Sequence, residues 1–83
     1  MKINEKVFYS DFCSETEKNS VIALLEDLDQ KAINAETRRI RFLNEFANEE
    51  HEGEAITIKT SDGTYLYIED TYLDMPYSIE RIS

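Results

Sequence analysis

The sequence predicts an α+β fold in which one long helix or a helical hairpin, over about residues 14–51, packs on a small antiparallel sheet. Two observations lead to this prediction. Residues 14–52 contain neither Gly nor Pro, so no strong helix breaker interrupts them. Residues 55–69 alternate apolar and polar side chains on either side of an Asp-Gly pair, which is typical of a β-hairpin. An N-terminal strand or arm is expected to join this sheet.

The helical segment has a clear predicted start at Ser14. Ser14 and Glu17 have the spacing of a capping box, in which each side chain bonds the other residue's backbone amide. From Val21 to Phe46, apolar residues recur in alternating steps of four and three, which keeps one helix face apolar. The residues expected to mediate self-association along this face are Val21, Leu25, Leu28, Phe42 and Phe46.

Two structures fit this spacing. One is a single long helix that pairs with another copy, and the other is a helical hairpin that breaks near Ile33, with Asn34 capping a second helix. The unbroken spacing favours the single helix. A chain of 83 residues with its own sheet covers two short helices better, so the hairpin is slightly preferred.

The β-hairpin has two possible turns in the sequence. A two-residue Asp62-Gly63 loop pairs Ile58 with Tyr67, whereas a three-residue loop pairs Ile58 with Leu66. The three-residue loop gathers four aliphatic side chains on one face, so burial favours it. Tyr65 and Tyr67 then lie on the other, exposed face.

The two ends of the chain are predicted from shorter patterns. Residues 6–12 have the β-branched and aromatic content of a strand or an extended arm. Residues 70–77 read as a loop that contains Pro76, and residues 78–82 as a short final strand.

Length and composition set limits on the class of protein. Eighty-three residues form one domain, predicted over 1–83, and the formal net charge is −9. This acidity argues against direct binding to nucleic acid or to an anionic membrane, because such binders need a basic face. One Cys forms no internal disulfide, and no apolar run is long enough for a signal peptide or a membrane span. We therefore expect a cytoplasmic protein, in the host cytoplasm if a phage encodes it.

The sequence contains no recognisable catalytic motif. Cys13 and His51, which is the only His, are far apart in the sequence, and His51 is expected at a solvated helix end. The acidic residues around His51 lack the spacing of a helical zinc site or a calcium loop. We predict no catalytic residues, no bound metal, no cofactor and no enzyme activity.

Charge placement indicates a contact surface instead. Residues 41–83 have a net charge of −7, against −2 for residues 1–40, and four of the five tyrosines lie in the same half. Tyrosines beside carboxylates suit a basic protein partner, because the carboxylates steer it and pair with its arginines. The predicted partner-binding residues are Glu49, Glu50, Glu52, Glu54, Tyr65, Tyr67, Glu69, Asp70, Tyr72 and Asp74.

These features predict an acidic inhibitor that blocks a basic protein handling nucleic acid, with carboxylates standing where phosphates sit. Small acidic inhibitors of restriction or CRISPR nucleases from phages and mobile elements are similar in size and charge, which is a likeness of type only. Two alternatives remain open: an immunity protein or antitoxin that neutralises a basic toxin, and a homo-oligomeric structural or adaptor protein, which would be a homodimer if it pairs along the helical face.

Overall fold

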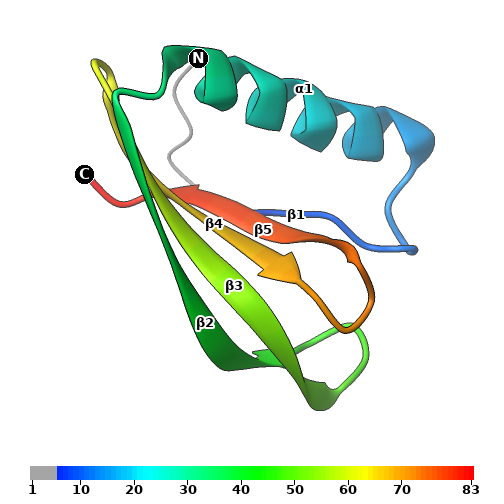
Figure 1. Cartoon of the computed structure of the whole chain (residues 1–83). Coiled ribbons are helices and arrows are strands. Elements are labelled where there is room, and N and C mark those ends of the chain that lie inside the picture. The colour runs from blue at the N-terminus through cyan, green and yellow to red at the C-terminus, as the bar shows by residue number, and fades with distance from the viewer. Residues whose placement is uncertain (1–5) are drawn as a thin grey trace.

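A computed structural model describes residues 6–83, so residues 1–5 of the predicted domain lie outside the described residues. One five-stranded antiparallel sheet, in the order β1-β5-β4-β3-β2, is covered on one face by a single helix (Figure 1). Strands β2 to β5 follow one another as hairpins, and the helix connects β1 at one edge to β2 at the other. The elements are β1 (Val7–Phe8), α1 (Glu15–Lys31), β2 (Asn34–Asn44), β3 (Glu49–Thr60), β4 (Gly63–Asp70) and β5 (Met75–Arg81).

Helix α1 begins where the sequence predicts and ends much earlier. The capping box is confirmed, because the Glu17 amide donates to Ser14 Oγ at 3.2 Å and the Ser14 amide donates to Glu17 Oε1 at 3.1 Å. After Lys31, Ala32 is extended and the chain enters β2. Both the long helix and the helical hairpin over 14–51 are therefore wrong, and the protein is mostly antiparallel sheet.

The strand that replaces the second half of the predicted helix has a physical basis in its residue types. Thr37, Ile40 and Phe42 are β-branched or aromatic and favour extended backbone. The residues from Asn34 to Arg39 are exposed on both faces of β2. A strand exposed in this way has no alternating apolar face, so its sequence does not show the period-two pattern that identifies strands.

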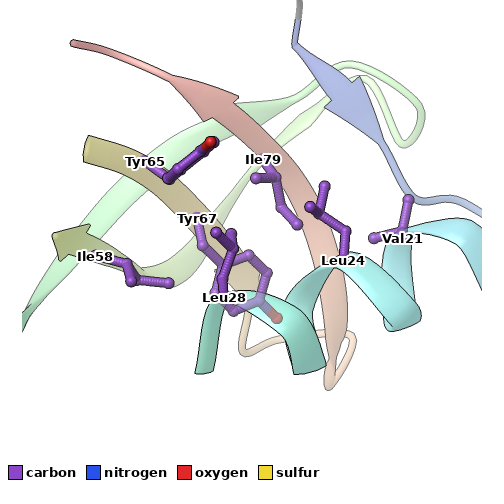
Figure 2. Packing of buried hydrophobic residues seen from close by; sticks show 7 residues of the cluster. All are labelled: Val21, Leu24, Leu28, Ile58, Tyr65, Tyr67 and Ile79. Atoms are coloured by element: carbon purple, nitrogen blue, oxygen red, sulfur yellow. The ribbon is translucent and has the colours of Figure 1, made fainter. Parts of the chain in front are cut away.

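The core lies between α1 and the middle of the sheet. Figure 2 shows three helix residues directed toward residues of β3, β4 and β5. Because α1 packs over these three strands, the core cluster of the described residues contains none from β2. Its members are Val21, Leu24, Leu28, Ile58, Tyr65, Tyr67 and Ile79.

The hairpin of β3 and β4 forms, but its predicted register is wrong. Ile58 pairs with Tyr65 and Thr60 with Gly63, so two residues, Ser61 and Asp62, make the turn. The Asp62 amide donates to Thr60 Oγ1, which in turn donates to the carbonyl of Gly63. This register buries two tyrosines against the helix, and aromatic side chains bury more apolar area than aliphatic ones.

The uncovered face of the sheet carries its own aromatic cluster. The ring of Tyr77 lies 4.8 Å from that of Phe42 and 5.5 Å from that of Phe8, measured between centroids. Phe42 packs on Gly53, where a Cβ atom would come within 2.7 Å of the ring. This glycine is required because a side chain there would displace Phe42.

The strands near the two ends of the chain have different bounds from those predicted. Within the predicted segment 6–12, only Val7–Phe8 is a strand. The predicted loop 70–77 is shorter, because β5 already begins at Met75 and includes Pro76 beside a register shift. In the described part of the chain, no helix has the length and apolar character needed to cross a membrane.

Candidate functional site

The turns that follow β2 and β4 have the same design. Each begins with a buried Asn or Asp whose side chain accepts hydrogen bonds from amides within the turn. Each ends with a residue at a φ of 55°, a left-handed conformation that Asn and Asp tolerate. The first residues are Asn44 and Asp70, and the last are Asn48 and Asp74.

A buried hydrogen-bond network joins the two turns. Asn44 Nδ2 donates to Asp70 Oδ2 at 2.7 Å, and His51 Nδ1 donates to the same oxygen at 2.7 Å. His51 Nε2 lies 2.8 Å from Glu49 Oε1. Ionised carboxylates only accept hydrogen bonds, so when Glu49 and Asp70 are both ionised, both ring nitrogens of His51 donate and the imidazolium form is favoured.

The pKa values of the network follow from these contacts. The hydrogen bond to Glu49, followed by the one to Asp70, raises the pKa of His51 above its usual 6.5. Burial by itself would raise the pKa of Asp70, but hydrogen bonds from His51, the Leu73 amide and Asn44 together lower it. Both shifts favour the ion pair of a cationic His51 with an anionic Asp70. The predicted solvated position of His51 is wrong, because only 4% of the residue is exposed.

The network supports an open depression on the surface, with a volume of about 440 Å³. The Tyr72 ring lies against the His51 ring at 4.7 Å between centroids, and 71% of Tyr72 remains exposed. Four of the predicted partner-binding residues, Glu49, Glu50, Glu52 and Tyr72, line this acidic depression. Its remaining lining residues are Arg41, His51 and Thr71.

Other predicted acidic residues lie on β3, on β4 and in the following turn. Glu54 and Glu69 are directly opposite each other on neighbouring strands. Partial burial, and then the charges of Glu54 and Asp74, raise the pKa of Glu69. Glu54 and Asp74 therefore both repel the carboxylate of Glu69. Two carboxylates of the acidic depression have basic partners among the described residues. Glu49 Oε1 lies 2.8 Å from His51 Nε2, and Glu52 Oε1 lies 3.6 Å from Arg41 Nη2.

The exposure expected for three of the predicted partner-binding residues is wrong. Tyr65 and Tyr67 belong to the core beneath α1, and burial raises the pKa of Tyr67 further than its neighbour Glu69 does. Asp70 is fully buried in the network. The error for Tyr65 and Tyr67 follows from the wrong hairpin register, because a shift of one residue moves every side chain to the other face of the sheet.

The continuous helical face predicted from Val21 to Phe46 does not form. Val21 and Leu28 are buried against the sheet, and Leu25 packs at the edge of the same core. Phe42 lies on β2 and Phe46 in the turn after it, so neither belongs to a helix. The apolar spacing from Val21 to Phe46 therefore spans two elements that serve different faces.

The sequence interpretation did not find a small apolar hollow beside the turns. Its volume is about 190 Å³, and the turns after β2 and β4 and the connection from β1 to α1 all contribute to it. Its exposed apolar side chains include Phe12, Phe46 and Leu73, which are 81%, 38% and 44% exposed. A possible signal was the equal spacing of Asn44 to Asn48 and Asp70 to Asp74, which marks two similar turns.

Other chemistry has little support in the geometry of residues 6–83. They contain no group of three or more His, Cys, Asp and Glu side chains placed to hold a metal ion. Both nitrogens of His51 bond carboxylates, whereas Cys13 Sγ contacts Ser10 and the Phe8 carbonyl. No protein-family model, curated protein or solved structure matches the chain.

Proposed function

We propose that this protein is a non-enzymatic acidic inhibitor that binds a basic protein which handles nucleic acid. The observation that carries the proposal is the acidic depression, which Glu49, Glu50 and Glu52 line together with the exposed Tyr72. The carboxylates would occupy the partner's phosphate-binding positions, and the tyrosine would supply an apolar anchor. The site of action would be the cytoplasm of the cell that contains the partner.

The repulsion between carboxylates supports a role in binding. Like charges directly opposite each other on neighbouring strands destabilise a sheet, and Glu54 and Glu69 stand in this relation. A basic partner would relieve this repulsion when it binds.

The rigid support of the depression also favours this function. Its residues lie on β2, on β3 and at the start of the turn after β4, and the buried ion pair of His51 with Asp70 ties β3 to that turn. A preformed surface loses less conformational entropy on binding than a flexible one.

The test is affinity capture with the tagged protein from its source cell or that cell's host. We expect it to retain a nucleic-acid-binding protein at physiological salt and to release it when about 0.5 M salt is added, because salt screens exposed charges. Duplex DNA should compete with the tagged protein for the captured partner. A toxin among the captured proteins would favour the immunity-protein alternative.

A pair of matched double variants tests the position of the contact. Glu50→Lys/Glu52→Lys should abolish capture, whereas Glu26→Lys/Asp29→Lys, with the same change of net charge on α1, should preserve it. All four positions are exposed, so both variants should fold. Equal capture by the two double variants would refute the assignment of the acidic depression.

A further inference from the structure

The outer edge of β2 has no neighbouring strand in the described structure. This strand, Asn34–Asn44, is 11 residues long and pairs only with β3. The opposite edge of the sheet is the two-residue strand β1, so β2 is the one long edge of the sheet. A free edge presents unpaired amides and carbonyls, to which another extended chain can add as a strand.

The first part of β2 is also exposed on both faces of the sheet. The core under α1 comes from β3, β4 and β5, and residues 34–39 are exposed whichever face of the sheet they occupy. A strand added to the outer edge of β2 would therefore not be covered by α1 and would not clash with it.

The charge on β2 is opposite to that of the rest of the molecule. Arg38, Arg39 and Arg41 fall within four residues of a chain whose net charge is −9. Successive residues of a strand point to opposite faces, so Arg38 lies on the uncovered face of the sheet. Arg39 and Arg41 lie on the face that α1 covers farther along the sheet. Only Arg41 forms an ion pair, with Glu52, among the salt bridges between described residues.

The arginines decide whether a second copy of this chain or an acidic strand of another protein fits the edge of β2 better. A second copy that pairs antiparallel through the middle of β2 would bring the two arginine runs together, and like charges opposite each other destabilise a sheet. A strand with acidic side chains at successive positions would meet guanidinium groups on both faces instead. Arginine forms strong, often bidentate hydrogen bonds with carboxylates.

We propose that the outer edge of β2 binds an acidic extended segment of a partner protein, which adds to the sheet as a sixth strand. The backbone ladder supplies the binding energy, and Arg38, Arg39 and Arg41 supply the preference for acidic side chains. This site shares Arg41 with the lining of the acidic depression, whereas Arg38 and Arg39 lie outside it. The proposal does not depend on the function proposed for the depression.

Three synthetic peptides of about ten residues, a length common for strands, test this proposal. The first alternates Glu-rich and Thr/Val positions, the second replaces every Glu with Lys, and the third keeps all Glu but contains two interior Pro residues. We expect the first to bind and to slow amide hydrogen exchange within residues 34–44. The Lys peptide and the Pro peptide should each bind at least about tenfold more weakly, because they lack the charge or the ladder.

Matched variants of the protein complete the test. Arg38→Gln/Arg39→Gln should weaken binding of the acidic peptide about tenfold or more, whereas Lys6→Gln/Lys18→Gln, with the same loss of charge far from β2, should not. Three results would overturn the proposal. They are equal binding of the Pro peptide, slowed exchange confined to residues outside β2, and formation of a dimer through β2 in the absence of peptide.

Discussion

His51 is the side chain that ties the two turns of the sheet to each other most directly. It donates to Asp70, whose carboxylate also receives the amide group of Asn44 from the other turn. On its other side it orients Glu49, which lines the acidic depression. The sequence contains all four residues, but nothing in their spacing reveals the network, because their proximity depends on the pairing of β2, β3 and β4.

The buried imidazolium predicts a specific pH dependence of stability. The pKa of His51 is raised above 6.5 in the folded protein, so its contribution is complete below about pH 6.5 and is lost as the pH rises through the folded value. The pKa of Asp70 is lowered from 3.8, so its contribution is present above that value and is lost as the pH falls through the lower, folded value.

An NMR titration of the single histidine measures this pKa without ambiguity of assignment. Urea unfolding at about pH 5.5 and about pH 8 should show the greater stability at the lower pH. The His51→Gln variant should lose most of this difference. A pKa for His51 below 6.5 would contradict the ion pair.

At the scale of elements, the sequence predicts termini and turns better than it predicts the middle of the chain. The capping box at Ser14 and the β-hairpin around residues 61–63 carry local signals that do not depend on the rest of the fold. The extent of α1 could not be predicted in this way, because neither Gly nor Pro marks its end and residues 34–39, which begin β2, are exposed on both faces. The hairpin register depends on which side chains are buried, and the prediction buried four aliphatic residues where the structure buries Tyr65 and Tyr67.

The corrected register predicts opposite effects for two tyrosines. Tyr65 is 2% exposed and packs under α1, so Tyr65→Ala should reduce the free energy of unfolding by about 3–5 kcal/mol. Tyr72 is 71% exposed, and Tyr72→Ala should cost less than about 1 kcal/mol.

Chemical denaturation measures both effects. Because a loss of this size is enough to unfold a domain of 83 residues, Tyr65→Phe provides a folded comparison that keeps the ring in the core. A small effect of Tyr65→Ala would contradict the burial of Tyr65 beneath α1.

At the scale of the whole molecule, the distribution of charge matters as much as its sum. The net charge of −9 is concentrated on and beyond β3, whereas β2 carries three arginines in four residues. The sequence correctly locates the acidic half, since charge is read directly from residue types. Which carboxylates share a surface could not be read, because that depends on strand pairing.

This charge predicts that salt stabilises the folded protein. Raising the salt concentration from about 0.01 M to about 0.15 M shortens the screening length from about 30 Å to about 8 Å and weakens the repulsion between carboxylates. The melting temperature should therefore rise. Glu69→Gln, which removes one charge opposite Glu54, should stabilise the protein at low salt by about 0.2–1 kcal/mol.

Glu26→Gln is the matched control, because it removes the same charge from an exposed position on α1. The difference in stabilisation between Glu69→Gln and this control measures the repulsion between Glu69 and its neighbouring carboxylates. A melting temperature that falls with added salt would mean that attractive ion pairs dominate the surface.

The strand order has a consequence for the route by which the chain folds. Strands β2 to β5 pair with their neighbours in sequence, so each of these pairings closes only a short loop. The pairing of β1 with β5 brings Val7 beside Ile79 and closes a loop of nearly the whole chain. Because loop-closure entropy must be lost before such a contact forms, we expect the four-stranded meander to form first and β1 to join it last.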